Sequence, residues 1–177
     1  MRTALLVIDV QQALSSGRWA AFDIDRVVDR INQASAKARM AGVPVFFVQH
    51  EEADSPMTFD SAGWQLYERL DVRPEDVRVR KTTPDSFHGT DLHALLQGHD
   101  VGRLVVCGMQ SECCIDSTVR AAAAHGYGVV LLSDAHTTMD NAVLTAAQIV
   151  AHHNATLVTI GGYGVAITAI PAAELTL

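Results

Sequence analysis

Short apolar runs alternate along the chain with longer segments in which apolar residues recur at helical spacing. The first run, TALLVIDV at 3–10, has no polar alternation, which is typical of a strand buried on both faces of a sheet. The segment VRVRK at 77–81 alternates instead and also predicts a strand. Together, the pattern predicts six strands, at 3–10, 43–50, 77–81, 103–108, 127–135 and 155–162.

The segments between these runs predict helices. After Asp23, which can cap a helix, apolar residues follow the 3.6-residue period until Gly42 ends the segment. The tail 163–177 favours no particular element. Further helices are expected over 90–98, 111–125 and 140–150, the last one capped by Asp140 and carrying Val143, with a short helix suggested over 64–70.

Strands that alternate with helices build a parallel sheet covered by helices on both faces. Right-handed crossovers favour the strand order 3-2-1-4-5-6, in a three-layer α/β sandwich. A chain of 177 residues without a linker or repeat is expected to form a single domain, residues 1–177. Strands one and four are then neighbours, and a crevice opens beyond their carboxyl ends.

Charge and composition argue against several functions. The formal net charge is −7, and the 13 Lys and Arg residues form no cluster that could neutralise a run of phosphates. The apolar run at 4–8 is too short for a signal peptide or a membrane span. Three cysteines without disulfide spacing indicate a reducing compartment. We therefore expect a cytoplasmic protein with no nucleic-acid partner and no membrane association.

Two charged residues lie at strand ends that face the expected crevice. Asp9 ends an apolar strand, where a carboxylate is poorly solvated and needs a partner. Lys81 lies on the same side of its strand as Val77 and Val79, at the carboxyl end. One interpretation is structural, with Asp9 as a cap or ion pair and Lys81 extending past the rim into water. The other is an ion pair between Asp9 and Lys81 inside the crevice.

Two of the three cysteines are adjacent, at the start of the helix expected over 111–125. Helical spacing places Cys113 on a polar face with Asp116, which should raise the pKa of the Cys113 thiol. Cys114 lies at the border between this polar face and the core, where a cleft wall would be. Both thiols are in the first turn, where the helix dipole favours a thiolate. Cys114 is therefore the candidate nucleophile, with two small packing residues as the alternative, and Cys107 is interpreted as a core residue.

Three segments together resemble the isochorismatase-like cysteine hydrolases. They are IDVQ at 8–11, Lys81 in KTTPDSF, and GMQSECCI followed by STVRAA. The resemblance spans nearly the whole chain and implies a six-stranded parallel α/β sandwich with a catalytic triad of Asp9, Lys81 and Cys114. The family pattern has one cysteine, six residues after a glycine and directly before Val or Ile, and Cys114 occupies that position.

The resemblance also implies a chemistry. It places a cis peptide at Met109-Gln110, which would let the backbone N–H groups of Gln110 and Cys114 form an oxyanion hole. The expected reaction is hydrolysis of an amide-type C–N bond of a small molecule through a thioester acyl-enzyme, without a cofactor. True isochorismatases lack the nucleophilic cysteine, so Cys114 argues against their vinyl-ether cleavage. Metal-binding nicotinamidases carry an Asp-x-His motif that is missing from QHEEADSPMTFD at 49–60, so no metal is expected, and His50 is interpreted as capping its strand.

Three alternatives stay open at this point. A Rossmann-like protein that binds a small molecule or nucleotide without hydrolysis would need a glycine-rich loop after strand one, where the sequence is DVQQALSSGRW. A redox pair of Cys113 and Cys114 would close a strained ring, and a catalytically silent binding protein fits the same pattern. We expect a homo-oligomer, dimer or tetramer. Candidate substrate contacts, each equally compatible with a place in the core or at a subunit interface, are Gln12, Trp19, Trp64 and Phe87.

Overall fold

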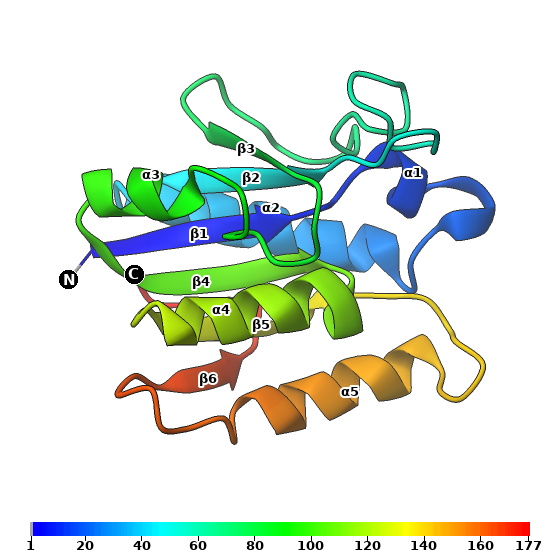
Figure 1. Cartoon of the computed structure of the whole chain (residues 1–177). Coiled ribbons are helices and arrows are strands. Elements are labelled where there is room, and N and C mark those ends of the chain that lie inside the picture. Colours follow the sequence, from blue (N-terminus) through cyan, green and yellow to red (C-terminus); the bar gives the residue numbers. More distant parts are fainter. Residues whose placement is uncertain (1) are drawn as a thin grey trace.

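Six parallel strands form one sheet in the order β3-β2-β1-β4-β5-β6, which confirms the fold that the sequence predicts (Figure 1). A computed structural model describes residues 2–177, with Arg18 described by its backbone alone. All neighbouring strands pair in parallel, so their carboxyl ends lie along the same edge of the sheet. The strands are β1 (Arg2–Ile8), β2 (Val45–His50), β3 (Val77–Lys81), β4 (Val101–Met109), β5 (Gly128–Thr137) and β6 (Ile167–Ile170).

Helices cover both faces of the sheet (Figure 1). One face carries α2 (Ile24–Met40) and the turn η3 (Ala172–Glu174). The opposite face carries α3 (Leu92–Gly98), α4 (Asp116–Ala124) and α5 (Ala146–Leu157). Within residues 2–177, none of the helices has the length and apolar character that spanning a bilayer requires. Shorter turns follow β1 and β4, namely α1 (Gln12–Ser15), η1 (Gly17–Trp19) and the π-helical η2 (Ser111–Ile115).

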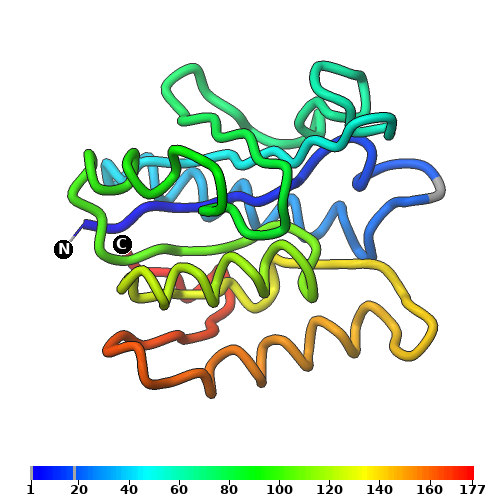
Figure 2. Tube along the Cα trace, viewed as in Figure 1, coloured from blue at the N-terminus to red at the C-terminus, as the bar shows by residue number. Residues whose placement is uncertain are grey.

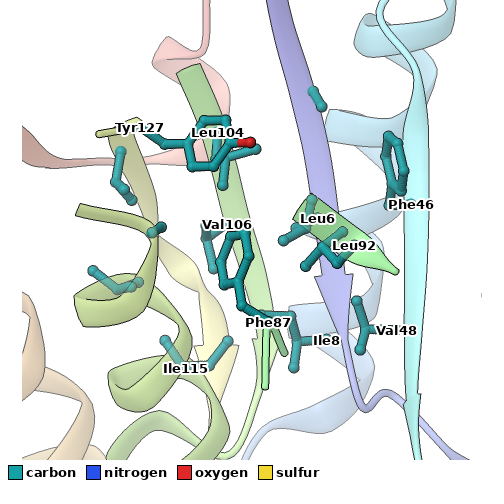
Figure 3. Packing of buried hydrophobic residues seen from close by; sticks show 14 of the residues in the cluster. Leu6, Ile8, Phe46, Val48, Phe87, Leu92, Leu104, Val106, Ile115 and Tyr127 are labelled. Carbon is teal, nitrogen blue, oxygen red and sulfur yellow. The ribbon is translucent and has the colours of Figure 1, made fainter. Parts of the chain in front are cut away.

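The side chains of β1 are divided between two apolar cores. Leu6 and Ile8 pack with residues of α3 and α4 on one face (Figure 3), whereas Leu5 and Val7 pack beneath α2 on the other. Each fully buried aliphatic side chain contributes about 1.5–3 kcal/mol to stability. This two-sided burial explains why the sequence of β1 shows no polar alternation.

β3 is an edge strand of the sheet, and only one of its faces is buried. Val79 and Lys81 are buried, while Arg78 and Arg80 on the opposite side are exposed. This agrees with the side of the strand that the period of two assigns to Lys81. The ammonium group of Lys81, at the carboxyl end of β3, therefore lies in the interior of the protein.

The segment 51–76 contains no helix and folds back over the carboxyl ends of β1 and β2 (Figure 2). The short helix expected over 64–70 is a wrong prediction. In its place, the backbone N–H of Tyr67 donates to the carbonyl of Val10, and Gln11 forms an antiparallel bridge with Leu66. The backbone groups of this segment are thus satisfied partly by local turns and partly by the chain that follows β1, not by an internal helix.

The C-terminal part differs from the sequence prediction in two elements. The run at 155–162, expected to be the sixth strand, begins as the last turn of α5, and β6 lies further on at 167–170. A short apolar run in a sequence is compatible both with a strand and with the buried end of a helix. Here it is the end of a helix, because Leu157 is the last residue of α5 and is fully buried. The N-cap of α5 is Thr145, not Asp140, because Thr145 and Gln148 form a capping box. Val143, expected on this helix, lies before it and is 84% exposed.

β1 and β4 approach each other very closely at Gly108. Its φ is +116°, and a Cβ built there would lie 2.1 Å from the carbonyl oxygen of Ile8. Gly108 is directly paired with Ile8 in the sheet. Glycine at this position therefore allows the last residues of the two strands to align, just before the loops that carry Asp9 and the cysteines.

Replacing Gly108 with alanine should destabilise the protein by about 3 kcal/mol or more, because the new Cβ combines an unfavourable φ with a backbone clash. Urea unfolding monitored by circular dichroism measures this loss. Gly126→Ala is a matched control, since Gly126 also has a positive φ (+84°) but no atom within 4 Å of the added Cβ. Equal losses for the two variants would contradict the close-approach argument.

Candidate active site

Asp9, Lys81 and Cys114 come from three separate parts of the chain and meet at the carboxyl edge of the sheet. Lys81 Nζ lies 2.7 Å from Asp9 Oδ2 and 3.3 Å from Cys114 Sγ. Asp9 directly follows β1, Lys81 ends β3, and Cys114 belongs to η2 after β4. The structure thus brings together the three residues that the sequence singles out as a triad.

The backbone at Asp9 turns sharply out of β1. Its φ of 54° lies in the left-handed region, which Asp tolerates better than most residues. The N–H of Asp9 still donates to the carbonyl of Val48 in β2, and the N–H of Gln11 donates to the carbonyl of Asp9. These bonds fix the point at which the chain leaves the sheet, and with it the base of the Asp9 side chain.

The three side chains are almost entirely removed from solvent. Asp9 is 1% exposed, Lys81 2% and Cys114 9%. Burial raises the pKa of Asp9 well above its ordinary value, and it outweighs the opposing charge of Lys81. Burial alone would lower the pKa of Lys81, but Asp9 and Cys114 together leave it raised. A carboxyl group with a raised pKa beside a cation can accept the proton of a neighbouring thiol and return it.

The turn η2, which carries both cysteines, is anchored to β5 and the residue after it. Ser111 Oγ lies 2.8 Å from His136 Nδ1, and Thr138 Oγ1 donates to Glu112 Oε1 at 2.8 Å. Burial lowers the pKa of His136 to about 4, so its ring is neutral at physiological pH. The peptide Met109-Gln110 at the entrance of this turn is cis, as the family resemblance implies.

The two adjacent thiols are coupled. Cys114 Sγ donates to Cys113 Sγ at 3.9 Å, and Cys113 is only half buried. This bond lowers the pKa of Cys113 to about 7. The same bond and burial raise the pKa of Cys114, against the opposing effects of Lys81 and of a hydrogen bond to Asp9. The resting Cys114 is therefore a thiol that loses its proton only when a base removes it.

The raised pKa of Cys113 that was expected from Asp116 is not found, because that pKa is lowered and Asp116 is not among the groups that shift it. Both oxygens of Asp116 are engaged by Arg120, at 2.8 and 3.0 Å, which compensates the carboxylate charge. The hydrogen bond from Cys114 has the largest effect on the pKa of Cys113. The helical faces were predictable from spacing, but the distribution of protons between the two sulfur atoms was not.

His50 is a site residue that the sequence interpretation missed. It does not cap its strand: its Nδ1 lies 3.3 Å from Lys81 Nζ, and His50 and Lys81 are direct partners in the pairing of β2 with β3. The predicted strand order and the alternation of both strands carried this signal, because they put the two strand ends side by side on one face.

The four candidate substrate contacts are not gathered at one place. Gln12 and Trp19 line a cavity of about 800 Å³ beside segment 61–65, whereas Trp64 lines a different one of about 600 Å³ next to β3. Phe87 is buried in the core with the residues of α3 and α4 (Figure 3). Within residues 2–177, no three His, Cys, Asp or Glu side chains are grouped so that they could hold a metal ion.

Comparison with known proteins assigns the chain to a family. The model of the isochorismatase domain matches residues 3–161. The chain belongs to the isochorismatase family. The crystal structure of another isochorismatase family protein, 38% identical in sequence, superimposes with a TM-score of 0.86 and covers 95% of this chain and 97% of that one.

Among relatives in the isochorismatase family, a streptothricin hydrolase from Streptomyces noursei is 43% identical over 141 residues. The match covers 77% of this chain and 50% of that protein, so the chain spans about half the length of this relative. The ureidoacrylate amidohydrolase RutB from Pseudomonas syringae pv. syringae is 30% identical, with 75% of this chain and 69% of that protein covered. Hydrolases are thus represented among the family members that this chain resembles.

Replacing Cys113 with alanine should lower the pKa of Cys114, because it removes the hydrogen bond that raises it. Alkylation of Cys114 by iodoacetamide at pH 7 should become about tenfold faster or more, as followed by mass spectrometry of the peptide that contains it. Cys107 is fully buried and serves as an internal control that stays unlabelled in the folded protein. An alkylation rate for Cys114 that matches the wild type would contradict the coupling.

Proposed function

We propose that this protein is a cysteine hydrolase that cleaves an amide-type C–N bond of a small molecule through a thioester. The observation that carries the proposal is the buried ammonium of Lys81 in contact with both the carboxylate of Asp9 and the sulfur of Cys114. A cation in this position stabilises a carboxylate base and a thiolate nucleophile at the same time.

In the first half of the reaction, Asp9 takes the proton from Cys114 and the thiolate attacks the carbonyl carbon of the amide. The negative oxygen of the tetrahedral intermediate is held by the backbone N–H groups of Gln110 and Cys114. Each such donor is worth about 3 kcal/mol in comparable sites. Asp9 then returns the proton to the nitrogen as the C–N bond breaks, and the amine leaves.

In the second half, a water molecule replaces the amine. Asp9 takes one proton from this water, and the resulting hydroxide attacks the thioester carbon. The bond between carbon and Cys114 sulfur breaks, the thiol recovers its proton, and a carboxylic acid is released. One amide and one water thus give one acid and one amine. Lys81 keeps its charge throughout and orients Asp9.

The relatives suggest which amides to test first. Because proteins named streptothricin hydrolase and ureidoacrylate amidohydrolase are similar to this chain, streptothricin and ureidoacrylate belong in the first panel, with carbamoyl compounds, nicotinamide and lactams. Release of ammonia or amine is the readout, with formation of the ring-opened amino acid for the lactams, and absence of turnover on all of them would favour the alternative of a binding protein. A homo-oligomer and a cytoplasmic location remain predictions, to be tested by sedimentation and fractionation.

Cys114→Ala and Cys114→Ser should both abolish turnover, a loss of at least about 1,000-fold in kcat, because alanine has no nucleophilic group and a serine hydroxyl is a much weaker nucleophile than a thiolate. Cys113→Ser should keep most of the activity, because the hydrogen bonds of the Lys81 ammonium go to His50, Thr83 and Cys114 and not to Cys113. Steady-state kinetics on the best amide of the panel provide the test. If loss of Cys113, and not of Cys114, stops the reaction, the nucleophile is wrongly assigned.

Lys81→Met should lower kcat about 100-fold or more while the protein still unfolds cooperatively. Lys81 lowers the pKa of Asp9 against the effect of burial, so its removal raises that pKa further. Because Asp9 must be ionised to act as a base, the acidic limb of the pH–rate profile should move to higher pH. Lys37, the other lysine of the chain, bonds to backbone carbonyls of η3 and is the control. Lys37→Met should change stability but leave the pH profile where it is, and an unmoved acidic limb in Lys81→Met would exclude the triad role.

A further inference from the structure

Four acceptor groups surround the ammonium of Lys81. Its Nζ lies 2.7 Å from Asp9 Oδ2 and 3.0 Å from the carbonyl oxygen of Thr83. It also lies 3.3 Å from Cys114 Sγ and 3.3 Å from His50 Nδ1. A lysine ammonium has only three N–H groups. The contact with Asp9 is the shortest and is an ion pair rather than a directed hydrogen bond, and Thr83 accepts one N–H. When the ammonium turns an N–H onto Asp9, Cys114 and His50 compete for the one that is left.

A hydrogen bond at this contact requires one tautomer of His50. An ammonium can only donate, so Nδ1 must present its lone pair and the ring proton lies on Nε2. Burial, followed by the charge of Lys81, lowers the pKa of His50, with Asp9, Glu52 and a hydrogen bond to the backbone of Thr83 acting in the opposite direction. Lys81, Asp9 and Glu52 are the charged groups that act on the ring from β3 and from the segments that follow β1 and β2. A neutral imidazole is therefore the form that fits beside the ammonium.

The position of His50 is fixed by a fully buried glutamine. Gln11 Nε2 donates to the carbonyl oxygen of His50 at 2.9 Å, and Gln11 Oε1 accepts from the N–H of His50 at 2.8 Å. Gln11 Nε2 also donates to the carbonyl oxygen of Trp64 at 2.8 Å. The amide of Gln11 thus holds the last residue of β2 on both its backbone groups. The imidazole is presented to Lys81 by this fixed backbone.

We propose that His50 is a positioning residue that shares one N–H of Lys81 with Cys114 and thereby controls how strongly Lys81 polarises the nucleophile. The inference rests on the proposed function, in which Cys114 attacks the substrate. In the resting protein, His50 draws part of this N–H away from the sulfur, and Cys114 remains a thiol. When the thiolate forms, its full charge outcompetes the neutral imidazole, and the third N–H turns to the sulfur.

Two substitutions separate this role from packing. His50→Asn places an amide oxygen close to the position of Nδ1 and keeps an acceptor for Lys81, whereas His50→Leu keeps the volume and removes the acceptor. The variants are made in a Cys113→Ala background, so that alkylation by iodoacetamide reports on Cys114. The rate is measured from pH 5 to 10. His152→Gln is the matched control, because His152 is exposed on α5 and its contacts are with Thr156 and His153 of the same helix.

In His50→Leu, the third N–H is free for Cys114, so alkylation at pH 7 should be about fivefold faster or more and its midpoint should move to lower pH. His50→Asn and His152→Gln should follow the parent profile. An unchanged or slower rate in His50→Leu would overturn the proposal. The same alteration in His50→Asn and His50→Leu would also overturn it, because both substitutions would then act through packing. Thermal melting verifies that each variant is folded.

The tautomer supplies a second and independent test. In protein carrying ¹⁵N-labelled histidine, long-range ¹H–¹⁵N spectra should show His50 with a bare Nδ1 and a protonated Nε2. A proton on Nδ1 would overturn the proposal, because that nitrogen could not then accept from Lys81. Neither test needs a substrate. A protein that hydrolyses none of the amides can therefore still confirm the role of His50, and a failure here leaves amide hydrolysis untouched.

Discussion

The buried ion pair between Asp9 and Lys81 is the interaction on which the rest of the site depends. Placing a carboxylate and an ammonium out of water costs several kcal/mol for each ion, which only close contact and additional hydrogen bonds can offset. The pair also has to reach across the sheet, because β2 lies between β3 and β1. Neighbouring strands are about 4.8 Å apart, so the two strand ends are separated by about 10 Å. Only a long side chain such as lysine can span this distance, and it passes over the end of β2, where His50 lies.

The parts of the fold that follow from chain-level rules were predictable from the sequence. Strand order results from right-handed crossovers between buried parallel strands, and the side of Lys81 results from the two-residue period of β3. The parts that failed depend on contacts between distant segments. Residues 64–70 pair with the chain after β1, and 155–157 complete a helix whose end is buried, neither of which a local pattern contains. The same holds for His50, whose importance depends on the residue beside it in β3.

For the two cysteines, too, one feature was predictable from the sequence and another was not. Helical spacing separates a residue at the border of the core from one on the polar side, and Cys114 is indeed the more buried of the two. The position of the proton between them depends on the contact between the sulfur atoms and on the burial of each thiol. The sequence shows which groups can exchange a proton. Which of them holds the proton depends on their exact positions in the folded protein.

The exposed arginines of β3 bear on how this protein behaves at high concentration. β3 is one of the two edge strands of the sheet, and an edge strand can recruit a strand from another molecule and start aggregation. Arg80 is paired with Glu51, and its guanidinium lies 3.6 Å from the centre of the Phe59 ring. A strand added from outside would have to displace or desolvate this cluster. The strand that supplies the buried ammonium therefore carries, on its exposed face, charges that oppose edge-to-edge association between molecules.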